Sequence, residues 1–195
     1  MVFLRSVPSV DTGPILYGDG VMLRSPQMSD FREWSELREK SRNFLVPWEP
    51  TWPQDDLTKS AFRRRIRRYQ QDIRDDRAYP LFAFSSKDDS LVGGLTLSNV
   101  RRGVAQACSL GYWVGAPYAR QGLMTSSVAT VTSFVFDQLG FHRLEAACLP
   151  SNEASIRLLR KSGFSEEGYA RRYLKINGVW QDHLLFALLS GDAHP

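Results

Sequence analysis

The stretch that decides how this chain folds is ACSLGYWVGAPYARQGLMT, residues 107–125. Its apolar run from Leu110 to Val114 is typical of a buried strand. A loop bounded by Gly115 and Gly122 follows, and a periodic apolar segment typical of a helix begins at Leu123. The first turn of a helix holds N–H groups without intrahelical partners, and the helix dipole adds partial positive charge there. A strand, a tight loop and a helix N-terminus in this order therefore predict a phosphate-binding site.

Single residues of this loop also suit phosphate. Gly122 lets the backbone approach a ligand closely, Arg120 supplies a cation and Gln121 supplies a hydrogen-bond donor. The loop contains neither G-x-G-x-x-G nor the Gly-Lys-Ser/Thr of a Walker loop, which argues against those two nucleotide sites. The residues leave two interpretations open: a looser pyrophosphate-binding loop, or a loop whose glycines only shape the connection.

The length and composition are those of an ordinary globular domain. Of the 195 residues, 43% are hydrophobic and 24% are charged. No apolar run approaches the roughly 20 residues that cross a bilayer, and residues 1–14 lack the apolar core of a signal peptide. We therefore expect an N-terminal segment over 1–14, a single domain over 15–190, no membrane contact and a cytoplasmic location.

The cysteines and histidines point to no metal or redox chemistry. Cys108 and Cys148 lie in apolar segments without C-x-x-C spacing, so we expect reduced core residues. His142, His183 and His194 share no metal-ligand spacing, so we expect no metal site. The net charge of +4 suits a phosphate-bearing ligand or an RNA-rich neighbourhood, but it is too small to establish either.

The rest of the chain alternates strand and helix patterns. Hairpin-turn signals occur at residues 18–20 and at Asn177-Gly178, and three antiparallel strands are expected between residues 79 and 114. Helices are expected after an N-cap at Ser29, over 55–76, over 123–139 and after an N-cap at Asn152. This order predicts an α/β fold with a mixed sheet of about seven strands flanked by four helices.

Two segments between the first helices have an undecided role. Three prolines exclude a helix from residues 44–53, FLVPWEPTWP, whose Trp48 and Trp52 either form the wall of a site or cap the core. The following helix carries five arginines from Arg63 to Arg68, spread over more than one helix face. Such a run is typical of a solvated surface, and contact with nucleic acid or with a cofactor phosphate is the alternative.

Several segments together resemble the GNAT superfamily of acetyl-CoA-dependent N-acetyltransferases. The family's loop usually reads Gln/Arg-x-x-Gly-x-Gly/Ala, and residues 119–124 match it at Gly122 but depart at Ala119 and Met124. Because the loop acts through backbone N–H groups, these departures do not remove its chemistry. The N-x-x-S at 152–155 followed by K-x-G-F at 161–164 is similar to the RimJ/RimL branch. Residues 44–50, 98–100, 167–170 and 180–183 are similar to ribosomal-protein-alanine N-acetyltransferases.

The resemblance implies a GNAT fold and direct attack of a neutral amine on the thioester of acetyl-CoA, without a metal. It implies that the pantetheine arm follows residues 112–114 and that the N–H of Val114 polarises the thioester carbonyl. The implied cofactor-binding residues are Tyr112, Trp113, Val114, Arg120, Gln121, Gly122, Leu123, Met124, Thr125, Asn152 and Ser155. The implied acceptor-binding residues are Trp48, Glu49, Trp52 and Asn99.

The resemblance also suggests residues for proton transfer. Glu167 matches a glutamate proposed as the base in this branch, and Glu49 is the second candidate. Ser155 is the suggested general acid; many relatives use a tyrosine at the position of Leu159. Simple structural roles stay open, since Glu167 can be an exposed residue at a strand end, and both Ser155 and Asn152 can satisfy the first turn of a helix.

The amine chemistry favours an N-terminal acceptor. An α-amino group with a pKa near 7.7–8 is roughly 10–20% neutral at pH 7, whereas a lysine amine is only about 0.04% neutral. The sequence offers no strong base, such as a histidine beside a carboxylate near the site. We therefore expect acetylation of a protein N-terminus of the Ala or Ser type, and the resemblance implies a small-subunit ribosomal protein. The alternatives are a small-amine acetyltransferase and a ribosome-assembly or RNA-binding factor that uses Arg63–Arg68; monomer and homodimer both stay open.

Overall fold

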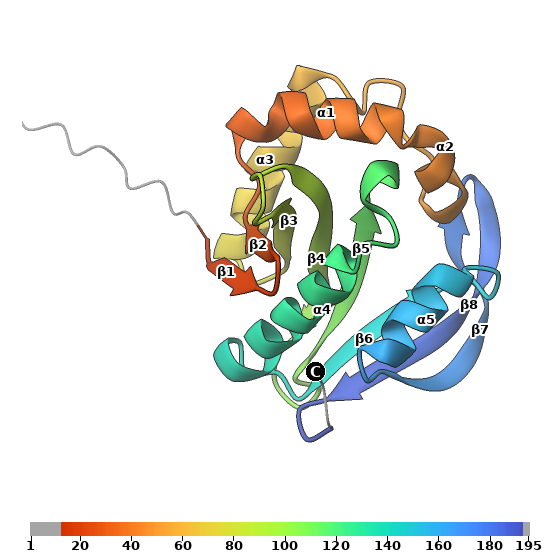
Figure 1. The fold of residues 1–195 in the computed structure, drawn as a ribbon. Helices are drawn as coiled ribbons and strands as arrows, with labels where there is room; N and C mark the ends of the chain where they lie inside the picture. Colours follow the sequence, from red (N-terminus) through yellow and green to blue (C-terminus); the bar gives the residue numbers. More distant parts are fainter. Residues whose placement is uncertain (1–12, 193–195) are drawn as a thin grey trace, which may run out of the picture.

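The computed structural model describes residues 13–192, so most of the predicted N-terminal segment lies outside the described residues. One sheet carries eight strands in the order β1-β2-β3-β4-β5-β6-β8-β7 (Figure 1). The strands are β1 Ile15–Gly18, β2 Val21–Arg24, β3 Tyr79–Ser85, β4 Leu91–Arg101, β5 Ala107–Val114, β6 Arg143–Cys148, β7 Ser165–Ile176 and β8 Val179–Leu189. Among these strands of residues 13–192, only β5 and β6 pair in parallel. The mixed sheet is confirmed, with eight strands rather than about seven.

Five α-helices flank the sheet in the described part of the chain, where four were predicted. They are α1 Phe31–Lys40, α2 Arg42–Leu45, α3 Lys59–Arg74, α4 Leu123–Ser133 and α5 Glu153–Lys161. The additional helix, α2, is a single turn directly after α1. The helix predicted over 123–139 changes at Phe134 into a π-helical segment, Phe134–Gln138.

The predicted starts of two helices were wrong. Ser29 is not the N-cap of α1, because residues 28–30 form a 3-10 turn in which the Gln27 N–H donates to the Asp30 carboxylate at 2.7 Å. The helix α3 begins at Lys59 rather than at Asp55, because the Thr58 hydroxyl accepts from the Ala61 N–H at 3.2 Å and caps it there.

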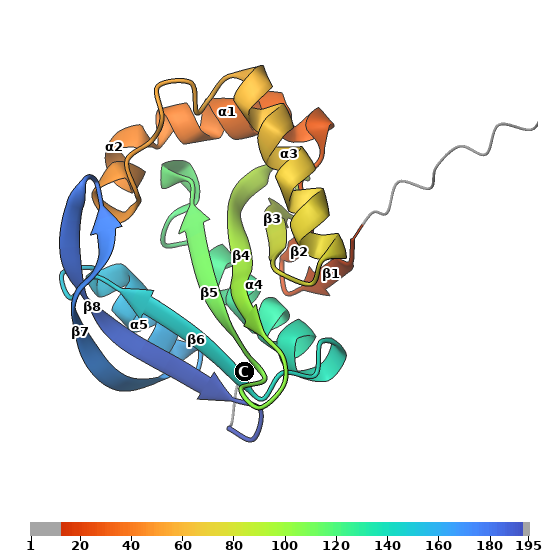
Figure 2. The same cartoon turned by 180° about the vertical axis from the view of Figure 1, so that it is seen from behind.

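The helices cover the two faces of the sheet unequally. On one face, α4 and α5 pack along the strands through residues such as Val128 and Leu159. On the other face, α1 and α3 cover β3 and the adjoining ends of β4 and β5, where Trp34 and Phe62 belong to one cluster with Phe82, Leu91 and Trp113. Seen from behind, β5, β6 and β8 therefore lie in front of α4 and α5, with no helix of residues 13–192 over β6 and β8 (Figure 2). We call the remaining surface of β4–β8 on this side, away from Leu91 and Trp113, the open face.

The two cysteines are buried and unpaired, as predicted. Cys108 is fully buried and Cys148 is 6% exposed, and both lie in the core under α4 and α5. Burial raises the pKa of the Cys108 thiol to about 12 and that of the Cys148 thiol to about 11. Over the described residues, no helix is long and apolar enough to cross a membrane. In the same part of the chain, no cluster of His, Cys, Asp or Glu side chains is arranged to hold a metal ion.

Candidate active site

The site lies where β5 and β6 separate. The parallel pairing of these strands runs from Ala107 opposite Arg143 to Leu110 opposite Ala146 and then stops. The end of β5, residues 111–114, continues beside β4 alone. Its edge toward β6 therefore presents backbone N–H and C=O groups that β6 does not satisfy, and an extended ligand can pair with them.

The register shows which backbone groups face this edge. Val114 lies opposite Gly93 on β4, and the N–H of Gly115 donates to the carbonyl of Val92 at 2.8 Å. Bonds in this position flank a non-hydrogen-bonded pair of an antiparallel ladder, so the N–H of Val114 is directed away from β4. Tyr112 lies opposite Leu95, two positions earlier, and has the same orientation. The groups predicted to meet the pantetheine arm and the thioester carbonyl are thus available.

The loop after β5 leads into an uncapped helix N-terminus. Gly122 has φ +82° and is the N-cap of α4, and no side chain caps this helix. The first backbone bond of the turn runs from the N–H of Ser126 to the carbonyl of Gly122 at 3.0 Å. The N–H groups of Leu123, Met124 and Thr125 come before it and have no intrahelical partner.

The space around this helix N-terminus fits a phosphate group. A Cβ built on Gly122 would meet no atom within 4 Å, so the N–H groups lie open. Arg120 is exposed with φ +63°, while Gln121 donates to the carbonyl of Pro117 at 2.8 Å. Met124 contributes only its N–H, because its side chain is buried in the core. Unpaired N–H groups and an adjacent cation are the arrangement that binds pyrophosphate.

Three of the predicted residues meet at the start of α5. The Asn152 side chain accepts from the Ser155 N–H at 3.1 Å, which confirms Asn152 as the N-cap. The Tyr112 hydroxyl donates to the Ser155 hydroxyl oxygen at 3.1 Å. Burial raises the pKa of Tyr112 well above its ordinary value, so the phenol stays protonated. This pair of hydroxyls connects β5 to α5 across the place where β5 and β6 diverge.

The loop predicted to line the acceptor site is fixed by a buried arginine. Arg38 on α1 donates from both terminal nitrogens to the Glu49 carboxylate, at 2.7 and 2.6 Å. The Trp52 indole donates to the same carboxylate at 2.7 Å. The Arg38 guanidinium lies 4.1 Å from the Trp52 ring and 4.9 Å from the Trp113 ring. We call Arg38, Glu49, Trp52 and Trp113 the arginine clamp, because it ties the loop to the strand that carries Val114.

Two further hydrogen bonds connect Glu49 and the end of α1 to other parts of the chain. The Asn177 N–H at the turn between β7 and β8 donates to the backbone carbonyl of Glu49 at 2.9 Å. The Ser41 hydroxyl after α1 accepts from the Ala116 N–H of the loop before α4 at 2.9 Å. The loop of residues 44–53 and the loop between β5 and α4 are therefore both held by the C-terminal end of α1. Trp48 is 37% exposed beside this clamp.

Arg38 was not predicted, although the sequence holds a signal for it. It stands four residues after Trp34 and one after Leu37, both of which are buried. A charged residue at this spacing lies on the apolar face of the helix, where a partner is required. The sequence cannot say that Glu49 is this partner, because the two residues come together only in the folded chain.

Asn99 and Glu167 lie on the open face. The Asn99 amide donates to the Ser109 hydroxyl at 3.3 Å, and Ser109 is the pairing neighbour of Glu145 on β6. Glu167 is exposed and is bound bidentately by Arg143, which also bonds Glu145 at 2.9 Å. Hydrogen bonds from Arg143 lower the pKa of Glu167.

Glu167 is not grouped with Tyr112 and Ser155. Its strand, β7, is separated from β5 by β6 and β8. Three strand spacings correspond to roughly 14 Å, which is beyond direct proton transfer to a group at the end of β5. Its carboxylate bonds Arg143, whereas the Tyr112–Ser155 pair lies on the side covered by α5.

A polar pocket of about 400 Å³ lies beside the start of α5. It is lined by Leu149, Pro150, Ser151, Tyr169, Arg172, Trp180, Gln181 and Asp182. Asp182 accepts from the Tyr169 hydroxyl at 2.5 Å and from the Arg172 N–H at 2.7 Å. These bonds lower the pKa of Asp182, so this pocket contains an ionised carboxylate at neutral pH.

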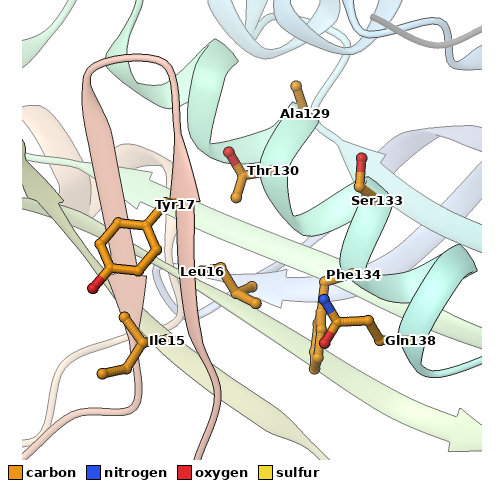
Figure 3. A pocket seen from close by; sticks show the side chains of 8 residues that line it. All are labelled: Ile15, Leu16, Tyr17, Ala129, Thr130, Ser133, Phe134 and Gln138. Carbon is orange, nitrogen blue, oxygen red and sulfur yellow. The ribbon is translucent and has the colours of Figure 1, made fainter.

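A second pocket, of about 480 Å³, lies away from this site between β1 and α4. Its lining is Ile15, Leu16, Tyr17, Ala129, Thr130, Ser133, Phe134 and Gln138 (Figure 3). These side chains come from the first strand and from the end of the helix opposite its free N–H groups. Its lining contains no carboxylate, imidazole, thiol or ammonium group.

Comparison with known proteins agrees with this geometry. Residues 21–165 match the family model of the acetyltransferase (GNAT) domain. The chain is 35% identical to the probable N-acetyltransferase YjcK of Bacillus subtilis, over 91% of this chain and 98% of that protein. It is 31% identical to the ribosomal protein uS5-alanine N-acetyltransferase of Escherichia coli, over 91% of each.

A solved structure is also similar to this chain in both fold and sequence. Mycobacterium smegmatis RimJ in complex with CoA-disulfide superimposes with a TM-score of 0.84 and 32% identity, over 92% of this chain and 87% of that one. The family model spans most of the sequence, and relatives above 30% identity span nearly all of it. The chain therefore belongs to the GNAT family and is an acetyl-CoA-dependent N-acetyltransferase of the RimJ/RimL type.

Proposed function

We propose that this enzyme acetylates the N-terminal α-amine of a protein, of the Ala or Ser type, and that the protein belongs to the small ribosomal subunit. The observation that carries this proposal is the similarity to the uS5-alanine N-acetyltransferase over 91% of both chains. The amine chemistry supports it, because an α-amine needs little deprotonation at neutral pH.

In the proposed reaction, the neutral amine attacks the acetyl carbonyl directly and the C–S bond breaks. The Val114 N–H donates to the carbonyl oxygen as negative charge develops there, which is the role of a fixed dipole in an oxyanion site. The amine passes one proton to water or to a carboxylate. The leaving thiolate, whose conjugate thiol has a pKa near 8.5, accepts a hydrogen bond from Ser155 and needs little protonation.

For the proton of the amine we propose two carboxylates: Glu49, and Glu167 acting through intervening water, because its strand lies three strand spacings from β5. Full deprotonation of an α-amine raises the reaction rate at most about tenfold at pH 7. Either carboxylate therefore contributes no more than this factor to the rate. Glu167 stays ionised because Arg143 lowers its pKa. Three of the roughly four acceptor positions of Glu49 are used by Arg38 and Trp52, which leaves about one for an incoming ammonium.

A small cationic amine is the alternative substrate. Such a substrate needs several carboxylates around its pocket, and the loop of residues 44–53 carries one, Glu49, which is already neutralised by Arg38. This arrangement favours the protein N-terminus. Trp48, Trp52 and Asn99 are the proposed contacts for the acceptor chain.

The test is thiol release from acetyl-CoA with peptides that differ only in their first residue. We expect turnover with Ala and Ser, and at least tenfold less with Met, because small first residues define the proposed class. Equal turnover with all three peptides would contradict the proposed selectivity. Turnover with spermidine or an aminoglycoside that exceeds turnover with all peptides would favour the small-amine alternative.

A further inference from the structure

The helix α3 carries a row of cations that the acetyl-transfer chemistry does not use. Lys59, Arg63, Arg67 and Arg74 are all exposed, and at 100° per residue they lie within roughly 80° of one another around the helix axis. We call these four residues the basic stripe. It runs for about 22 Å along the helix, at 1.5 Å per residue.

The basic stripe is free of acidic partners. The adjacent Arg64 and Arg65 are paired with Asp55 and Asp56. In contrast, none of the four stripe residues forms an ion pair within residues 13–192, and only Arg74 makes a side-chain hydrogen bond, to Gln71 at 2.8 Å. The ion pairs therefore neutralise Arg64 and Arg65, whereas Arg68 and the four stripe residues keep their charge without a carboxylate partner.

Of the 19 arginines within residues 13–192, twelve form ion pairs and seven do not, and four of these seven, Arg63, Arg67, Arg68 and Arg74, lie on α3. The other three are Arg120, in the loop proposed to bind pyrophosphate, and the neighbours Arg171 and Arg172 on β7. Elsewhere arginines are paired even when they are exposed, as Arg32 and Arg157 are. An unpaired row of this length on one helix therefore points to an anionic partner.

The residues of α3 favour a nucleic acid over an anionic membrane as the partner. A membrane-binding helix inserts an apolar face, but Phe62 and Ile66 of α3 are buried against the sheet and Ile73 is partly buried. The exposed stripe consists of guanidinium and ammonium groups spaced about 6 Å apart along the first part of the helix. Guanidinium groups match phosphate oxygens in geometry, and a row of them suits a chain of phosphates.

We propose that the basic stripe binds RNA through its phosphate backbone. The stripe lies at the side of the molecule that carries β1 to β3, away from β5, α5 and the β7–β8 hairpin (Figures 1 and 2). RNA bound there leaves the β5–β6 opening free. This inference goes beyond the proposed acetylation and does not depend on it, because it rests on the charges of α3 alone.

The experiment measures binding of a fluorescent 20-nucleotide single-stranded RNA as a function of salt. We expect the whole chain to bind at 100 mM KCl, with an affinity that falls as salt rises. The variant R63Q/R67Q removes two stripe charges; it should bind about tenfold more weakly, and its salt slope should be smaller by about 1.4. Acetylation of a free peptide should be unchanged, which separates this inference from the proposed function.

The matched control is R157Q/R160Q on α5, which removes the same net charge from two exposed, ion-paired arginines. Its RNA affinity should change less than twofold. Equal losses in the two double variants would mean that only net charge matters and would overturn the proposal. Absence of RNA binding at 100 mM KCl would also overturn it, as would stronger binding to anionic phosphatidylserine vesicles than to RNA.

Discussion

At the residue scale, the leaving-group chemistry that we propose depends on two hydroxyl groups. Tyr112 donates to Ser155 and stays protonated because burial raises its pKa. The hydrogen of the Ser155 hydroxyl is therefore free to be donated to the sulfur. Since a thiolate leaves readily, this bond stabilises the leaving group only modestly.

The variant S155A should consequently lose less than tenfold in kcat, and Y112F should lose no more than that. Both are measured as initial rates of thiol release with an Ala peptide at saturating acetyl-CoA. A thousandfold loss in S155A would show that protonation of the sulfur limits the reaction.

A pH profile of kcat/KM distinguishes Glu167 from Glu49 as the acceptor of the amine proton. If Glu167 accepts the proton, E167Q should lower kcat/KM about tenfold at pH 7 and hardly at all at pH 9, where the amine is already neutral. Because Arg143 lowers the pKa of Glu167, the unmodified enzyme should show no break caused by its protonation across this range.

The matched variant is E49Q, in which the amide oxygen can still accept from Arg38 or Trp52. A pH-dependent loss in E49Q and none in E167Q would assign the proton to Glu49. A loss in E167Q that is equal at pH 7 and pH 9 would contradict a role as base.

Of the two N-caps named from the sequence, Asn152 is correct and Ser29 is not. Asn152 was predicted as an N-cap, because that role depends on the backbone of the next three residues alone. The pairs Arg38–Glu49 and Arg143–Glu167 were not predicted, because they join residues 11 and 24 positions apart in the chain. The sequence identified Glu49 and Glu167 as candidates, but it could not tell that an arginine binds each of them.

At the element scale, the conformation of the loop between β5 and α4 depends on one residue with left-handed backbone angles, Gly122. Gly122 has φ +82°, and Gly140 at the end of the π-helical segment has φ +66°. Neither has an atom within 4 Å of the position a Cβ would take. They differ in that only Gly122 adjoins the free N–H groups of α4.

The variants G122A and G140A should therefore each lose about 1 kcal/mol of unfolding free energy, because alanine is strained at positive φ. Only G122A should raise the KM for acetyl-CoA, by about tenfold, because its methyl group stands where phosphate is expected. Urea unfolding and initial rates check the two effects. Equal changes in KM for both variants would contradict the assignment of this loop.

The arginine clamp makes a prediction about stability and about the acceptor. The variant E49A leaves the buried Arg38 cation without its carboxylate and should lower the unfolding free energy by about 3 kcal/mol. It should also raise the KM for the peptide more than the KM for acetyl-CoA, because the clamp holds the loop of residues 44–53. A stability loss below 1 kcal/mol, or equal effects on both KM values, would contradict this role.

The order of elements was predictable, but several of their ends were not. Hydrophobic periodicity and turn residues located the strands and the long helices. The start of α3 depends on Thr58 rather than on Asp55, because the cap competes with neighbouring polar residues that have similar preferences. The π-helical segment after Ser133 leaves no pattern in the apolar spacing, since Phe134 and Val135 are buried as they would be in an α-helix.

At the scale of the whole molecule, the fold divides the chemistry between two faces of one sheet. The α4 and α5 side holds the proposed pyrophosphate and thiol contacts, while Glu167 and Asn99 lie on the open face. The sequence predicts the sheet and the helices, but not which half of the sheet is left uncovered. That depends on α1 and α3 packing over β3 and the adjoining ends of β4 and β5.

The buried thiols report on the integrity of this packing. Cys108 and Cys148 have raised pKa values of about 12 and about 11, so only a small fraction is thiolate at pH 8. Neither should react with a disulfide reagent at pH 8 in the folded protein, and both should react rapidly in urea. Rapid labelling of either thiol without denaturant would contradict the buried core.

The most direct test of the central claim compares two peptides of the same sequence, which begins with Ala and contains one internal lysine. One has a free N-terminus and the other is N-terminally blocked. Incubation with acetyl-CoA should add one acetyl group to the first peptide, located by fragmentation at the α-amine, and none to the second. Acetylation of the blocked peptide at its lysine, at a rate comparable to that of the free peptide, would contradict an N-terminal acetyltransferase.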